Sequence, residues 1–146
     1  MNPLFLSSLS GWLCAQFIKT VISLLQGKIT DIKDLIASLI WKTGGMPSSH
    51  SSLVCALSTS IGFSAGVNSD IFILSMCFTL VVIRDALGVR RASGMQARAI
   101  NELGEELKSK NIVNFKPIKE VHGHKPLEVA IGCLLGFFTG MAFSVL

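Results

Sequence analysis

The last twenty residues of the chain read LEVAIGCLLGFFTGMAFSVL (127–146) and carry one charged side chain, Glu128. An apolar run of this length forms a helix long enough to cross about 30 Å of hydrocarbon. Residues 4–25, 50–67 and 71–83 are also apolar, and small residues such as serine and glycine recur in them. Small residues are typical of helices that pack closely in lipid. The pattern predicts an all-α integral membrane bundle of about four transmembrane helices.

The overall composition agrees with this class. Half of the 146 residues are hydrophobic, 15% are charged, and the mean hydropathy is +0.59. Such values are typical of a multi-span membrane protein. The length predicts a single membrane-embedded domain, 1–146. The four cysteines fall one in each apolar stretch, and we expect buried thiols at all four positions: Cys14, Cys55, Cys77 and Cys133.

Basic side chains predict how the bundle is oriented. The chain has 13 lysines and arginines, and every one except Lys19 falls in residues 28–42 or 84–125. Both segments flank a hairpin expected at 66–70, so they emerge on the same side of the membrane. The positive-inside rule predicts that this side is cytoplasmic and that both termini lie on the opposite side. In a bacterium the membrane is the inner or plasma membrane.

Two cytoplasmic segments have the pattern of short amphipathic helices. Residues 27–46 repeat apolar side chains at helical spacing, and a capping box at 93–96 predicts a helix to about Lys110. The N-terminus lacks the positive region of a cleavable signal peptide. There is no basic stripe interleaved with aromatic residues, so no nucleic-acid partner is expected.

A polar loop directly precedes the second apolar stretch and reads Gly44-Gly45-Met46-Pro47-Ser48-Ser49-His50. Glycines let a backbone bend and come close to a ligand, and proline suits the first turn of a helix. The serines and the histidine then lie beside the free N–H groups of the helix start, a place that attracts phosphate. A polar loop that only caps a membrane helix has the same composition.

Three polar clusters are expected to converge on the cytoplasmic mouth of the bundle, namely residues 47–50, 85–91 and 124–128. His124 and Glu128 are one helical turn apart, so the carboxylate can orient the imidazole as a nucleophile. His50 has the right pKa range for a general acid, and arginine binds phosphate bidentately. No cluster of carboxylates suggests a metal, and the scheme needs neither metal nor cofactor.

These stretches resemble a known family. Pro-Ser-Ser-His resembles the Pro-Ser-Gly-His motif of the type 2 phosphatidic acid phosphatase and vanadium haloperoxidase superfamily. Residues 44–50, 85–91 (Asp-Ala-Leu-Gly-Val-Arg-Arg) and 123–129 (Gly-His-Lys-Pro-Leu-Glu-Val) resemble the three signatures of its divergent branch. Ala15-Gln16 followed by Lys19 resembles the first-helix pattern of that branch. The resemblance spans about residues 15–130.

The resemblance implies roles for the polar residues. His124 would be the nucleophile, Glu128 its orienter and His50 the general acid. Four side chains would hold the phosphate: Ser48, Ser49, Arg90 and Arg91. Lys19 would replace the usual first-motif lysine and face the bundle interior, and Asp85 would pair with Lys19 or Arg91. Gly44 and Gly45 would support the loop.

The sequence also departs from the superfamily pattern. The usual arginine six to seven residues before the nucleophile is absent, since Pro117-Ile118 stands there. Arg90 or Arg91 would replace it only if the cytoplasmic helix folds back over the mouth. Glu128 stands where the superfamily has Asp, and an acidic residue there also complements the helix dipole without catalysis.

The leading expectation is a metal-independent membrane phosphatase. It would act on a lipid phosphate or diphosphate through a phosphohistidine, with the lipid tail in the bilayer. The alternative is a non-catalytic module that binds anionic headgroups or a protein partner. A small transporter is less favoured, because the polar clusters gather at one mouth and not at the midplane. Gly132, Gly136 and Gly140 are spaced for close helix packing, in a homodimer or within one chain.

Overall fold

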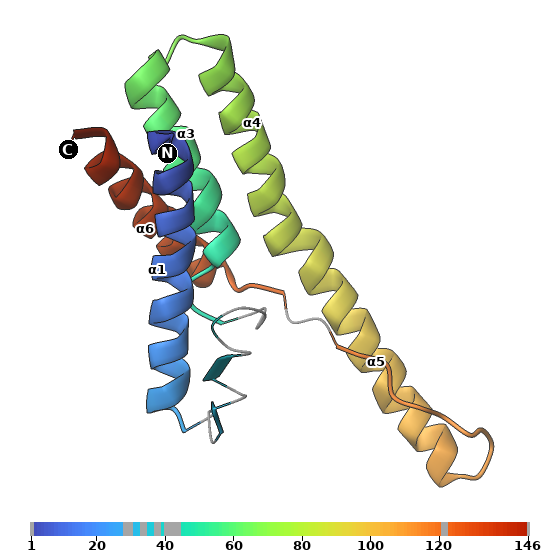
Figure 1. The fold of residues 1–146 in the computed structure, drawn as a ribbon. Helices are drawn as coiled ribbons and strands as arrows, with labels where there is room; N and C mark the ends of the chain where they lie inside the picture. Colours follow the sequence, from blue (N-terminus) through green and yellow to red (C-terminus); the bar gives the residue numbers. More distant parts are fainter. Residues whose placement is uncertain are drawn as a thin grey trace.

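The computed structural model describes residues 2–27, 31–32, 35–36, 39, 45–120 and 123–145, and within them it contains helices and no strands. The elements are α1 (Pro3–Leu25), α3 (Ser49–Ala65), α4 (Asp70–Arg84), the π-helical turn η1 (Asp85–Val89), α5 (Arg90–Ser109) and α6 (Pro126–Val145). Figure 1 shows α1, α3 and α6 close together, with α4 and α5 forming one long slanting helix. The all-α membrane bundle predicted from the sequence is confirmed.

The described helices differ in how well they can cross a bilayer. Three are long and apolar enough, namely α1, the continuous Asp70–Ser109 helix and α6. The fourth, α3, has 17 residues and six serines in its sequence, and is therefore about 25 Å long. It occupies the centre, in contact with α1, α4 and α6. Three helices that are long and apolar enough to span a bilayer thus contact a shorter, more polar one.

Hydroxyl groups join α3 to its neighbours. The hydroxyl oxygens of Ser7 and Ser60 are 2.6 Å apart, and Ser52 Oγ donates to the Gly11 carbonyl at 2.8 Å. These pairs show that α1 and α3 are antiparallel. Interhelical hydrogen bonds of this kind stabilise a bundle in lipid, where burial of apolar area drives little association. The serines of α3 are therefore structural for most of its length.

α6 packs on α3 through its row of glycines. Gly132, Gly136 and Gly140 lie against the α3 backbone, and a Cβ at Gly140 would come within 2.7 Å of the Ala56 carbonyl oxygen. Successive glycines along α6 contact successive turns of α3 in the same order, so the two helices run parallel. The prediction of packing within one chain is confirmed, and this face is not open to a second copy.

Gly136→Leu is expected to separate α6 from α3. A Cβ at this position already comes within 2.9 Å of the Cys55 Cβ and closer still to the Ser52 carbonyl oxygen, so the backbone must shift. Overpacking of this kind costs about 1–3 kcal/mol. Thermal unfolding in detergent should show a lower Tm than wild type. Ala130→Leu, at an exposed position of α6, is the control; equal Tm values for the two variants would contradict this packing.

The hairpin between α3 and α4 lies where the sequence predicts it. Gly66 has a φ of 86°, which favours glycine, and ends α3. The Ser69 side chain then caps α4 by accepting from the Phe72 N–H at 3.3 Å. At its other end α4 continues through η1 into α5 without a break. The predicted helix start at the capping box of 93–96 is therefore wrong, because the backbone is already helical there.

The segment after α5 returns toward the bundle along that helix (Figure 1). The Asn101 side chain donates to the Ile118 carbonyl and accepts from the Ile118 N–H, both at 2.9 Å. Phe115 packs against Gly104. These contacts guide the chain back to the start of α6. The predicted amphipathic helix at 27–46 falls mostly outside the described residues.

Candidate active site

His124 and Glu128 form a pair at the start of α6. Nδ1 of His124 lies 3.0 Å from Oε2 of Glu128, and the histidine side chain is 8% exposed. The same carboxylate oxygen accepts the Lys125 N–H at 3.1 Å, so the first turn of α6 holds it in place. With Glu128 ionised, Nδ1 carries the proton, and Nε2 keeps its lone pair. The contact predicted from the spacing is present.

A backbone hydrogen bond joins this pair to the start of α3. The Ser48 N–H donates to the carbonyl of Glu128 at 2.9 Å. Gly132, one turn further along α6, lies against the Ser48 backbone and permits this approach. The two motifs are therefore fixed to each other by main-chain atoms, although 80 residues separate Ser48 from Glu128 in sequence.

The start of α3 offers backbone donors. Ser48 is the N-cap residue, α3 begins at Ser49, and no side chain caps this end. The N–H groups of the first turn therefore have no intrahelical acceptor, and they carry the positive end of the helix dipole. Pro47 precedes the cap, so its predicted place in the first helical turn is wrong. The hydroxyl groups of Ser48 and Ser49 are buried at this helix start.

Lys19 is buried, with 3% of its surface exposed, as predicted for a lysine that faces the bundle interior. It lies 16 residues after the start of α1, and Ser49 lies 16 residues before the end of antiparallel α3. Both are therefore about 24 Å from the opposite surface of the bundle. Gly45, whose φ is 84°, lies beside the lysine stem, and the Glu128 charge acts on the ammonium group. Gly44 lies outside the described residues.

Asp85 pairs with Arg90, and its predicted pairing with Lys19 or Arg91 is wrong. Nε of Arg90 donates to Oδ2 of Asp85 at 2.6 Å, and both side chains are partly exposed. The π turn explains the choice of partner. Its i→i+5 geometry adds one residue per turn and places position 90 over position 85.

Arg91 approaches His124 in a different way from the one expected. α5 does not fold back over the mouth. Instead the segment before His124 folds onto α5, and Gly123 lies against the Arg91 backbone. A side chain at position 123 would prevent this contact. The return of the chain thus brings the double arginine to the neighbourhood of His124.

His50 occupies the exposed rim of the same site. The side chains of Arg90, Lys19, His124 and Asp85 lie close enough to act electrostatically on its imidazole. Side chains from α1, α3, η1, α5 and the start of α6 therefore share one mouth. The predicted convergence of the three polar clusters is present in the structure.

Two polar residues of this region were given no role from the sequence. Ser51 donates to the Ser48 hydroxyl at 2.9 Å and so orients it. Gln16 is 4% exposed, and within the described part of the chain its Oε1 has no hydrogen-bond donor. Both are polar residues in apolar runs, which is the signal that identifies them. The described residues contain no cluster of metal-ligating side chains.

Comparison with known proteins supports the family resemblance found in the sequence. A family model described as "Divergent PAP2 family" matches residues 1–139. The uncharacterized membrane protein YuiD of Bacillus subtilis (strain 168) is 39% identical over 150 residues, which cover 95% of this chain and 92% of the relative. No solved structure matches the chain significantly.

Proposed function

Because the chain belongs to the divergent PAP2 family, we propose that it is a phosphatase of membrane lipids. The substrate class is a lipid phosphate monoester or diphosphate, and the reaction passes through a phosphohistidine. The observation that carries the proposal is the His124–Glu128 pair, 3.0 Å apart and joined by the main chain to the uncapped start of α3. A nucleophile and a set of anion donors thus share one site.

The first step transfers the phosphoryl group. Nε2 of His124 attacks phosphorus, the P–N bond forms, and the bond from phosphorus to the lipid oxygen breaks. The leaving oxygen takes a proton from protonated His50. Charge on the equatorial oxygens is stabilised by Lys19, the Ser48 and Ser49 hydroxyls and the α3 backbone N–H groups, with Arg90 and Arg91 at the rim.

The second step regenerates the enzyme. Neutral His50 removes a proton from water, and the water oxygen bonds to phosphorus as the P–N bond breaks. Inorganic phosphate leaves, and Glu128 again holds the His124 Nδ1 proton. Neither step requires a metal or a cofactor.

The proposed orientation places this mouth in the cytoplasm and both termini on the opposite side. Its support is the distribution of lysine and arginine over residues 28–42 and 84–125. The mouth then faces lipid phosphates of the cytoplasmic leaflet.

Vanadate provides the decisive test. The purified, detergent-solubilised protein is assayed for phosphate release from a panel of lipid phosphates and diphosphates. Vanadate mimics the five-coordinate transition state, so it should inhibit release at a concentration at least about 100-fold below that of phosphate. A folded protein that binds anionic lipid, releases no phosphate and does not prefer vanadate would instead be a non-catalytic headgroup-binding module. The absence of the usual arginine six to seven residues before His124 favours that second candidate, because Pro117-Ile118 offers no guanidinium to stabilise a transition state.

A further inference from the structure

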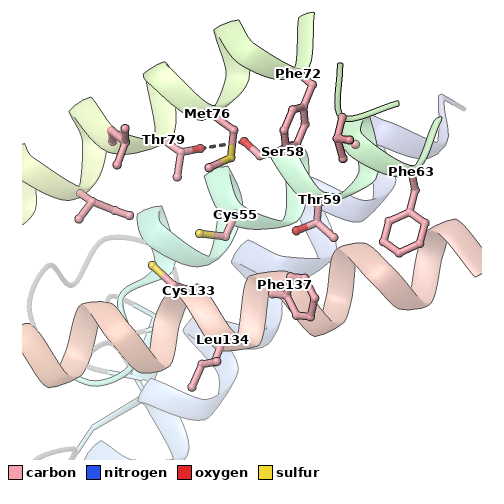
Figure 2. Close-up of a pocket in the computed structure, with 14 residues that line it drawn as sticks. Cys55, Ser58, Thr59, Phe63, Phe72, Met76, Thr79, Cys133, Leu134 and Phe137 are labelled. Carbon is pink, nitrogen blue, oxygen red and sulfur yellow. Dashed lines mark hydrogen bonds between the residues drawn. The ribbon is translucent and has the colours of Figure 1, made fainter. Parts of the chain in front are cut away.

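An apolar groove lies between α3, α4 and α6, on the membrane-facing part of the bundle (Figure 2). Its volume is about 590 Å³, and its lining contains no charged side chain. Cys55, Cys133 and Ile83 line one end, while Phe63, Val67 and Phe72 line the other. The proposed chemistry uses none of these residues.

Two hydroxyl groups in the wall, those of Ser58 and Thr79, are satisfied by the protein itself. The hydroxyl oxygens of Ser58 and Thr79 are 2.8 Å apart, as drawn in Figure 2. Ser58 also approaches the Ser75 carbonyl at 3.1 Å, and Thr79 approaches the Val54 carbonyl at 3.3 Å. These groups need no partner from a ligand. The wall therefore favours a hydrocarbon occupant.

The groove begins close to the candidate active site. Cys55 is five residues beyond His50 on α3, and Cys133 is five residues beyond Glu128 on α6. Each lies about 7.5 Å further along its helix. From Cys55 to Phe63 the groove continues along α3 for about another 12 Å. A hydrocarbon chain that extends from a phosphate at His124 would reach the groove within this distance.

Phe72 forms the far wall. A Cβ on Gly62 would come within 2.9 Å of Cε2 of Phe72, so the ring packs directly on the glycine. The α3–α4 turn follows immediately, at 66–69. The ring therefore bounds the length of the groove.

We propose that this groove binds one hydrocarbon chain of the lipid substrate and that Phe72, packed on Gly62, sets the chain length that fits. The proposal rests on the proposed function and adds to it a determinant of substrate specificity. The substrate class is then a lipid phosphate whose hydrocarbon chain enters the groove between α4 and α6. These two helices form the sides of the groove and flank α3.

A series of single-chain alkyl phosphates measures the chain length that the groove accepts. For the wild type, kcat/KM should rise about fourfold for each methylene that becomes buried and then level off. Thr59→Trp fills the groove, so it should remove this rise while the rate with the shortest phosphate is unchanged. Cys133→Phe does the same from α6. Phe72→Ala should move the levelling-off point to longer chains. Leu74→Trp, exposed on α4 and outside the groove, is the matched control.

Photolabelling separates this proposal from the proposed function. An alkyl phosphate with a diazirine near the chain end is irradiated with the full-length protein in vesicles, and labelled peptides are identified. Label on the groove residues without phosphate release would support chain binding in the groove and contradict the proposed phosphatase activity. Phosphate release with the label on residues outside the groove would overturn the proposed chain-binding site. The same holds if Thr59→Trp lowers kcat/KM equally for short and long chains. A cross-link from benzophenone at Leu80 to a second copy would also overturn it, since that copy would then fill the groove.

Discussion

His124→Ala is expected to abolish phosphate release from every lipid phosphate that the wild type hydrolyses. The variant keeps the backbone bond between Ser48 and Glu128, so the anion donors of α3 remain in place, but no nucleophile faces them. Loss of a nucleophile that acts together with its orienting group lowers kcat by about 10⁴-fold or more. Phosphate release by the purified variant, at saturating substrate, is the measurement.

A matched histidine serves as the control for this variant. His122→Ala changes a histidine two positions earlier in the same segment, and it should retain wild-type kcat. Binding of lipid phosphate to His124→Ala should persist, because binding depends on the donors and not on the nucleophile. Full activity of His124→Ala would show that phosphoryl transfer uses another residue.

Glu128→Gln is expected to lower kcat by about 10³–10⁴-fold with little change in KM. The amide is nearly the same size as the carboxylate, but its NH₂ group can donate to Nδ1 and so favours the tautomer with a proton on Nε2. The lone pair that attacks phosphorus is then lost. The main-chain bond to Ser48 does not depend on the side chain and remains. Steady-state kinetics with one lipid phosphate gives kcat and KM separately.

The same variant tests the simpler role of Glu128. If the carboxylate only complements the α6 dipole, its neutralisation costs about 0.3–1 kcal/mol of stability and leaves kcat at the wild-type level. A normal kcat with a slightly lower Tm would therefore contradict the orienting role. Glu120→Gln, a distant acidic residue bound to Asn101, is the control for charge loss alone.

The parts of the site that depend on helical spacing could be predicted from the sequence. His124 lies two residues before α6 and Glu128 lies in its first turn, so the short spacing across the helix start brings them together. Lys19 is a cation within an apolar helix, so its place in the interior follows from the energetic cost of exposing it to lipid. Local rules were sufficient for these two features.

Other parts depend on contacts that no local rule contains. Asp85 pairs with Arg90 because a π turn inserts one extra residue into the helix. A sequence pattern based on 3.6 residues per turn does not reveal that insertion. The helix also continues past the apparent cap at 93–96, where the backbone of α5 is already helical. The glycine row of α6 was compatible with two partners, and only the position of α3 decides between them. The link between Ser48 and Glu128 joins two main-chain groups, which leave no trace in the side-chain pattern.

For the proposed phosphatase, the length of α3 would also set the depth in the membrane at which the reaction takes place. Measured from the hairpin at Gly66, its 17 residues reach about 25 Å, whereas the hydrocarbon layer is about 30 Å thick. With Gly66 at the far boundary of the hydrocarbon layer, the proposed anion-binding end of the helix would lie some 5 Å beneath the plane of the headgroups. In the proposed reaction a lipid phosphate would have to move down to that level, and the buried ammonium of Lys19, at the same height, would offset its lost hydration. A thicker bilayer would lengthen this movement, so the proposed activity would depend on membrane thickness as well as on chemistry.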